Sequence, residues 1–239
     1  MAEAKRKWLP LESDPAVFTE FATKLGCSGL EFCDVFGLDV DLLAMVPRPV
    51  VAVILLFPIE GETGELANQE GHKEAGGQGS GSVFYVKQKI GNACGTIALL
   101  HAMANNRDLA TFQDGSFIST FVRDCEALSP DQRADYLDKK AEEGLESAHN
   151  AAAAADQEGG EGAKPITEEE MNTDLHFVCY VESEGGLWEL DGRSRLGATR
   201  VGDCTKETLL EGAADAIKKR MASSASIRFN LMACTLSQD

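Results

Sequence analysis

The stretch VVAVILLF, residues 50–57, is the most apolar segment of the chain and is bounded by Pro49 and Pro58. It is far shorter than the roughly 20 residues that a membrane-spanning helix needs. Continuous apolar character without alternation is typical of a strand that is buried on both faces. The sequence therefore predicts a central strand that begins near Val50, in a sheet that helices cover on both sides.

The segments around this strand show the patterns of helices. Ser13, Asp14 and Pro15 supply a cap and a first-turn proline, and apolar residues then recur at helical spacing up to Gly26. The helix that begins at Cys94 and ends near Asn106 is apolar on most sides, which predicts a central position. Further helices are expected at about residues 39–45, 116–127, 130–140 and 206–221.

Strand patterns alternate with these helices. The apolar runs VFYV (83–86), LHFVCYV (175–181) and LWELD (187–191) are expected as strands, and a Gly-containing turn joins the last two into a hairpin. A final strand is expected over residues 227–236. Strands and helices are thus mixed, which predicts an α/β (α+β) fold.

Two segments have the composition of surface loops. Residues 60–82 are rich in Gly, Glu, Gln and Ser, and residues 149–172 are rich in Ala, Gly and Glu. His72 and His149 lie within these segments, so both are expected to be exposed to solvent.

Length and charge limit the classes of function. A chain of 239 residues with 44% hydrophobic residues predicts one domain over residues 1–239. Lys and Arg number 22 against 39 Asp and Glu, which gives a formal net charge of -17. This charge repels nucleic acids and anionic membranes and favours basic partners.

The cysteines and the N-terminus indicate a reducing compartment. Seven cysteines are scattered without a CxxC motif or a Cys/His cluster at zinc-ligand spacing. The basic residues 5–7 precede LPLE, where a secretory signal needs a long apolar run. We therefore expect free thiols, no metal site and a cytoplasmic or nuclear location.

Cys94 is the candidate nucleophile because it lies where a Gly-Asn-Ala sequence enters the central helix. The N-terminus of a helix favours a thiolate, and the thiolate is the reactive form of cysteine. The alternative is an inert buried cysteine, which is the more common fate of such a residue.

His176 is the candidate base because it interrupts an apolar strand and Asp191 ends the neighbouring strand of the same hairpin. The two side chains could face each other across the ladder, with Asp191 orienting the ring. A locally hydrogen-bonded histidine and a turn-opening aspartate are equally simple interpretations. His101 is expected in the core. Gln88, six residues before Cys94, could donate its amide to an oxyanion or simply be a polar surface residue.

These segments together resemble the ubiquitin C-terminal hydrolase family of cysteine peptidases. The resemblance rests on QKIGNACGT (88–96), LHF (175–177) and LWELDGR (187–193), and extends to WLPLE (8–12), MVPRP (45–49) and RFN (228–230). It covers essentially the whole chain, with three separated motifs in the right order.

The resemblance implies a central antiparallel sheet flanked by helices, a knotted backbone and a papain-like catalytic core without cofactor. It implies Cys94 as nucleophile, His176 as general base, Asp191 as its orienter and Gln88 as oxyanion donor. Residues 149–172 match the place of the crossover loop, which in the family passes over the active site and limits substrates to small or flexible adducts.

The implied partner is ubiquitin, and a close ubiquitin-like modifier is a further possible substrate of a monomeric enzyme. By similarity, Glu12 and Asp34 are candidates for contacts with the arginines of the ubiquitin tail, and Leu175 for lining the approach to Cys94. Two other functions stay open: a ubiquitin-binding module with little turnover, and redox sensing through Cys94.

Overall fold

The computed structural model describes residues 6–59, 83–155, 171–222 and 228–237. Six strands form one antiparallel sheet in the order β2-β8-β3-β5-β6-β7, and β1 pairs with β4 in a separate two-stranded ribbon. The strands are β1 Cys27–Ser28, β2 Leu30–Asp34, β3 Val50–Pro58, β4 Thr111–Phe112, β5 Leu175–Ser183, β6 Gly186–Leu190, β7 Thr199–Asp203 and β8 Asn230–Leu236. The helices are α1 Pro15–Lys24, α2 Val40–Leu43, α3 Cys94–Asn105, α4 Phe117–Cys125, α5 Pro130–Lys140, η1 Ala141–Leu145, α6 Glu146–Ala155, η3 Lys206–Thr208 and α8 Leu209–Ala222.

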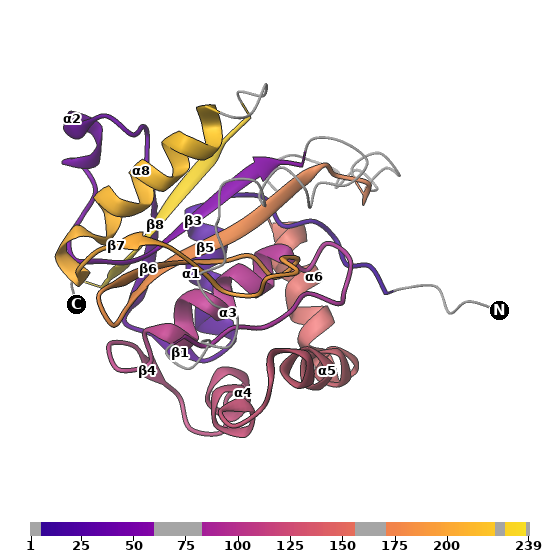
Figure 1. The fold of residues 1–239 in the computed structure, drawn as a ribbon. Coiled ribbons are helices and arrows are strands. Elements are labelled where there is room, and N and C mark those ends of the chain that lie inside the picture. Colours follow the sequence, from indigo (N-terminus) through magenta and orange to yellow (C-terminus); the bar gives the residue numbers. More distant parts are fainter. Residues whose placement is uncertain (1–5, 60–82, 156–170, 223–227, 238–239) are drawn as a thin grey trace.

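The central strand has the position that its apolar run predicts. β3 lies between β8 and β5, and the side chains of Val53, Ile54 and Leu55 are completely buried. Ile54 packs in the core beneath α3, whereas Val53 and Leu55 pack in a second core beneath α8. Both faces of this strand are therefore covered by helices, as Figure 1 shows.

The two cores give the molecule its layers. The larger core joins one face of the sheet to α1, α3, α4, α5 and α6, and the smaller joins the opposite face to α8 and α2 (Figure 1). The predicted fold class, a central antiparallel sheet flanked by helices, is confirmed. The knotted backbone stays a prediction.

The helix caps follow the sequence signals. Asp14 accepts a hydrogen bond from the Val17 N–H at 2.8 Å and precedes Pro15, the first residue of α1. Ser129 and Gln132 form a capping box at the start of α5. The helix expected at 39–45 is only the four residues of α2.

The strand expected at residues 83–86 is wrong. These residues belong to no strand, and side chains of α3 accept their backbone hydrogen bonds: Phe84 N donates to Asn105 Oδ1 at 2.7 Å, and Val86 N donates to His101 Nε2 at 3.0 Å. The segment therefore lies along α3 and leads directly into its N-terminal turn.

The loop expected at residues 149–172 is also corrected. Residues 149–155 belong to α6, and His149, expected to be exposed, is completely buried. Residues 156–170, and the segment 60–82 with His72, lie outside the described residues.

The remaining strands and helices differ from the prediction mainly at the sheet edges. The edge strands β2 and β7 were not predicted, and the described part of the last strand begins at Asn230. In the parts of the chain that the structure describes, no helix has the length and apolar character to cross a membrane.

Candidate active site

The first turn of α3 presents Cys94. Asn92, two residues earlier, has a φ of 59°, a left-handed conformation that asparagine adopts more readily than most residues. Ala93 occupies the N-cap position without a side-chain hydrogen bond, so the cap leaves the N–H groups of the first turn to other acceptors. The backbone of Gly95 contacts the Cys94 sulfur. The fold thus places the thiol where the helix dipole favours its charged form.

His176 joins Cys94 to Asp191. His176 Nε2 lies 2.7 Å from Asp191 Oδ1, and the His176 ring also hydrogen-bonds the Cys94 thiol. Because Nε2 is engaged by the carboxylate, we infer that Nδ1 is the nitrogen facing sulfur. The three side chains are only 3 to 8% exposed. The structure therefore brings together the three residues that the sequence singled out.

The way in which His176 meets Asp191 differs from the expected cross-strand pair. The β5–β6 ladder ends at the pair Cys179 and Leu190, and His176 pairs instead with Phe57 of β3. Asp191 follows the last residue of β6, and its Oδ1 also accepts the Arg193 N–H at 2.9 Å. This turn directs the carboxylate back toward the histidine.

The environment favours a thiolate and an imidazolium. Burial alone would raise the pKa of the Cys94 thiol, but the hydrogen bond and charge of His176, with backbone hydrogen bonds of Phe177 and Gly95, lower it below its usual value. Burial alone would lower the pKa of His176, but Asp191 and then Cys94 raise it to about 9. The two shifts together favour a Cys94 thiolate beside a protonated His176.

Asp191 stays ionised beside this pair. Burial opposes its charge, but His176 and the Arg193 N–H lower the pKa of its carboxyl below the usual range, and Arg220 adds to the effect. Tyr85 also fixes the position of Asp191, because its completely buried side chain donates the hydroxyl hydrogen to Asp191 O at 2.6 Å. The sequence analysis did not identify this residue. The one feature of the sequence that could have indicated its role is a tyrosine hydroxyl within the apolar run of residues 83–86.

A buried ion pair also lies behind the histidine. The Arg220 guanidinium is 4.5 Å from the centroid of the Phe57 ring, and this ring contacts His176 edge-on at 5.7 Å. Arg220 Nη2 lies 2.5 Å from Glu189 Oε1, and Tyr180 donates its hydroxyl to the same carboxylate at 2.7 Å. Sequence reasoning gave no indication of this cluster, because Tyr180, Glu189 and Arg220 come from β5, β6 and α8 respectively.

Gln88 lies beside Gly192, the residue that follows Asp191. Its backbone N–H donates to Gly192 O at 2.8 Å, and its side-chain Nε2 donates to Ile90 O at 3.0 Å. An amide nitrogen carries two hydrogens, so one N–H is not used by this bond. Its Oε1 is buried without a partner among the described residues. The bond to Ile90 fixes the amide in a single orientation.

Gly192 allows Gln88 to approach this closely. A Cβ at Gly192 would lie 2.8 Å from Ile97 Cγ2 and 3.1 Å from Gln88 Cβ. Any larger residue would push the segment that carries Gln88 away from α3.

The other cysteines are electrostatically unlike Cys94. All seven are free, as the sequence predicted. Burial raises the pKa of Cys27, Cys125 and Cys204 to about 11, and it raises the pKa of the remaining three, Cys33, Cys179 and Cys234, as well. The cytoplasmic or nuclear location stays a prediction.

These opposite shifts predict selective alkylation. At pH 7, iodoacetamide should modify Cys94 before the other six thiols, because only Cys94 has a lowered pKa. Its rate should fall as the pH falls through that pKa, since the thiolate then takes up a proton. Peptide mapping by mass spectrometry checks this, and native protein modified first at any other cysteine would contradict it.

The three residues proposed to contact ubiquitin lie at different distances from Cys94 and His176. Leu175 is half-buried beside His176 at the start of β5, and Glu12 is exposed next to Leu11. Asp34 is exposed at the end of the edge strand β2, with β8 and β3 between it and β5. Three strand spacings make roughly 14 Å, so Asp34 is not part of the reaction centre.

Within the described residues, no group of three or more His, Cys, Asp and Glu side chains could hold a metal ion. His101 is buried in the core, as predicted, where its Nε2 accepts from Val86.

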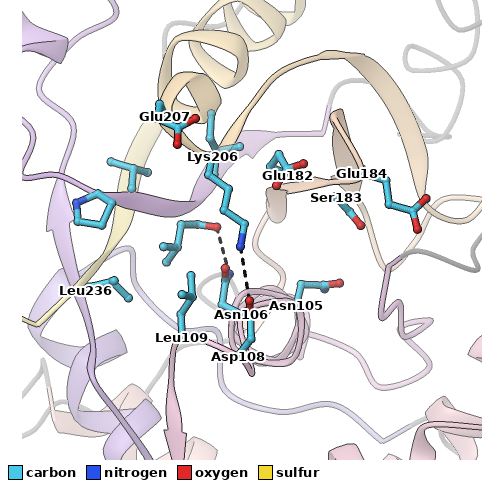
Figure 2. A pocket seen from close by; sticks show the side chains of 14 residues that line it. Asn105, Asn106, Asp108, Leu109, Glu182, Ser183, Glu184, Lys206, Glu207 and Leu236 are labelled. Carbon is cyan, nitrogen blue, oxygen red and sulfur yellow. Dashed lines mark hydrogen bonds and ion pairs between the residues drawn. The ribbon is translucent and has the colours of Figure 1, made fainter.

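The cavity in Figure 2, of about 410 Å³, is separate from Cys94 and His176. It lies at the C-terminal end of α3, where Asn106 Nδ2 donates to Val51 O at 3.0 Å and Lys206 Nζ lies 3.4 Å from Asp108 Oδ2. Cys94 begins the same helix of 12 residues, which spans about 18 Å. The cavity therefore lies at the end of α3 opposite Cys94.

Comparisons with known proteins find relatives over most of this chain. The sequence model of the family described as "Ubiquitin carboxyl-terminal hydrolase, family 1" matches residues 8–222. A probable ubiquitin carboxyl-terminal hydrolase of Dictyostelium discoideum is 39% identical over 236 residues, covering 97% of this chain and 89% of that protein. A ubiquitin carboxyl-terminal hydrolase of Aplysia californica is 40% identical over 220 residues, covering 92% of this chain and 97% of the relative.

A solved structure is similar over nearly the whole chain. The UCH37 catalytic domain of Trichinella spiralis, bound to ubiquitin vinyl methyl ester, superposes with a TM-score of 0.76 at 27% identity. The match covers 98% of each chain.

Proposed function

Because the chain belongs to family 1 of the ubiquitin carboxyl-terminal hydrolases, we propose that it cleaves bonds to the C-terminal glycine of ubiquitin with Cys94 as nucleophile. It is a cysteine-type deubiquitinating hydrolase. The observation that carries the assignment of roles is the buried contact of His176 with both Cys94 and Asp191. A nucleophile, a base and an orienter in contact are the constellation that acyl transfer requires.

Acylation begins from the ion pair. The Cys94 thiolate attacks the carbonyl carbon of the terminal glycine, and the electrons of the C=O bond move to oxygen. The His176 imidazolium then gives its proton to the leaving amine, alcohol or thiol as the tetrahedral intermediate collapses. The products are the released adduct and a thioester between ubiquitin and Cys94.

The oxyanion is stabilised by two kinds of donor. The N–H groups of the first turn of α3 supply backbone donors, and the second Nε2 hydrogen of Gln88 supplies a side-chain donor. The bond from Gln88 to Ile90 holds this amide in place before substrate arrives.

Deacylation uses the same residues in the opposite order. His176, now neutral, takes a proton from water as the water oxygen attacks the thioester carbonyl. The thiolate leaves, and the imidazolium forms again beside Asp191. The enzyme thus returns to the ion pair from which it started.

Substrate recognition follows the charge of the chain. The net charge of -17 attracts the basic tail of ubiquitin, with Glu12 and Asp34 as contacts and Leu175 beside the path to Cys94. The segment between α6 and β5 limits the substrates to small or flexible adducts, and a close ubiquitin-like modifier is a further substrate. The monomeric state stays a prediction.

Hydrolysis of ubiquitin bearing a fluorogenic amide at its terminal glycine tests this function. We expect turnover by the wild-type protein, and Gln88→Ala should lower kcat by about 10²- to 10³-fold because one oxyanion donor is lost. KM should change little, since this donor acts mainly in the transition state.

The same assay, run beside a binding titration, tests the alternative of a ubiquitin-binding module. Tight binding of ubiquitin without hydrolysis by the wild-type protein would favour the module and overturn the proposed activity. The assembled contact of His176 with Cys94 favours the enzyme.

A further inference from the structure

The N-terminal segment, residues 7–11, lies against both sides of the nucleophile. Trp8 N donates to Gly91 O at 2.9 Å, and Lys7 forms a parallel bridge with Gly91. On the helix side, Leu11 packs on Gly95 so closely that a Cβ there would lie 2.8 Å from Leu11 Cδ1. Gly91, at the third position before Cys94, and Gly95, directly after it, are thus both in contact with a segment more than 80 positions away in sequence.

Asn92 makes the contact on the N-terminal side of Cys94. Its Nδ2 donates to Trp8 O at 3.0 Å and to Met171 O at 3.0 Å, so both hydrogens of the amide are used. Met171 lies five residues before His176. One side chain therefore joins the turn before the nucleophile to the N-terminal segment and to the chain that enters β5.

His149 makes the contact on the C-terminal side. Its Nε2 lies 2.6 Å from Leu9 O, so Nε2 carries the hydrogen and donates it. Burial lowers the pKa of His149 to about 4, so the ring is neutral and Nδ1 is an acceptor. Thr96 Oγ1, 2.6 Å away, therefore donates to Nδ1. Thr96 and His149 are both completely buried.

The contacts of Asn92 and of the Thr96–His149 pair lie at equal sequence distances on either side of Cys94. Asn92 precedes Cys94 by two residues and Thr96 follows it by two, and they are tied to the consecutive carbonyls of Trp8 and Leu9. We propose that Asn92 and the Thr96–His149 pair are positioning residues, which hold Cys94 in register with His176 through the N-terminal segment. The proposal rests on the proposed function, in which Cys94 and His176 form the reactive pair.

The neighbouring contacts keep the N-terminal segment in place. Lys7 Nζ donates to Asn172 Oδ1 at 2.7 Å, and Leu9 N donates to Asn150 Oδ1 at 3.2 Å. Arg6 forms ion pairs with Asp138 at 3.3 Å and with Glu142 at 2.7 Å. The segment is therefore fixed by α5, η1, α6 and the chain before β5, so displacing it moves these parts relative to Cys94.

Two substitutions at Asn92 separate a hydrogen-bonding role from a backbone role. Asn, Asp and Gly all tolerate a positive φ. Asn92→Asp keeps the shape but places a carboxylate oxygen against two carbonyl oxygens, whereas Asn92→Gly only removes the amide. We expect kcat on the fluorogenic ubiquitin amide to fall about 10- to 100-fold in Asn92→Asp and less in Asn92→Gly, with KM within about twofold.

A matched pair at Thr96 tests the other side. Thr96→Val removes the hydroxyl that donates to His149 and keeps the side-chain volume, while Thr96→Ser retains the hydroxyl. Thr96→Val should lower kcat about tenfold, and Thr96→Ser should restore most of it. If Thr96→Val loses activity and Thr96→Ser loses it equally, the hydrogen bond from Thr96 to His149 does not have the proposed role.

Alkylation of Cys94 by iodoacetamide gives a readout that does not depend on ubiquitin. In Asn92→Asp and Thr96→Val, the pH midpoint of alkylation should rise, because a displaced His176 stabilises the thiolate less. A folded Asn92→Asp protein with wild-type kcat and wild-type alkylation would overturn the proposal. Absence of wild-type turnover would instead overturn the proposed function, and the alkylation comparison would still decide on the positioning role.

Discussion

Replacement of Cys94 by alanine should reduce kcat on a ubiquitin amide by on the order of 10⁶-fold, as removal of the nucleophile does in other acyl-transfer enzymes. This factor corresponds to about 8 kcal/mol of transition-state stabilisation. The reason is chemical: no other thiol among the described residues has a lowered pKa, so none can form the acyl-enzyme in its place. Steady-state hydrolysis of the fluorogenic ubiquitin amide measures the loss.

Folding and binding should survive this change. Alanine fits where cysteine does and leaves His176 paired with Asp191. The thermal unfolding midpoint and the Kd for ubiquitin therefore serve as controls, and both should remain close to wild type. Residual activity above about 1% of wild type in Cys94→Ala would show that another group attacks the substrate.

The elements that carry the candidate site could be predicted from the sequence, whereas the roles proposed for its residues came from the family resemblance. Cys94 begins an apolar helix, and His176 lies in an apolar strand, so their elements were predicted with nearly correct bounds. The spacing could not predict how His176 reaches Asp191, because their contact forms beyond the last pair of the ladder. There the turn of Asp191 to Arg193, rather than strand register, sets the geometry.

The segment before Cys94 shows the limit of local pattern. The apolar residues at 83–86 favour a strand, but the segment belongs to none. Whether an extended segment becomes a strand depends on its hydrogen-bond partner, which comes from elsewhere in the chain. Here the partners are Asn105 and His101, about 15 to 21 positions away on α3.

The opposite error occurred at α6. Its alanines were grouped with the Gly- and Glu-rich residues that follow them, and the whole segment was interpreted as a loop. Alanine has the highest helix propensity, and Ala152 and Ala153 are buried in the main core. Burial of His149 also followed from this, because a histidine on such a helix meets the core through the same face.

Replacement of His176 by glutamine should lower kcat by about 10⁴- to 10⁶-fold, second only to the loss of Cys94. Glutamine removes both the base and the imidazolium that protonates the leaving group. It keeps an N–H donor for Asp191, which would otherwise be a buried charge without its partner. The loss should therefore appear in kcat rather than in folding, and thermal unfolding provides the control.

The same variant should also change the titration of Cys94. In wild type, His176 lowers the pKa of the thiol against the effect of burial, and His176 keeps its proton up to about pH 9. Without the imidazolium, burial acts alone, so the pH midpoint of Cys94 alkylation should rise above the ordinary cysteine value. As the pH rises through about 9, wild-type activity should fall, since His176 then lacks the proton that the leaving group needs. If His176→Gln alkylates with the wild-type pH dependence, the ion pair is not the source of the reactivity of Cys94, and the helix N-terminus must supply it alone.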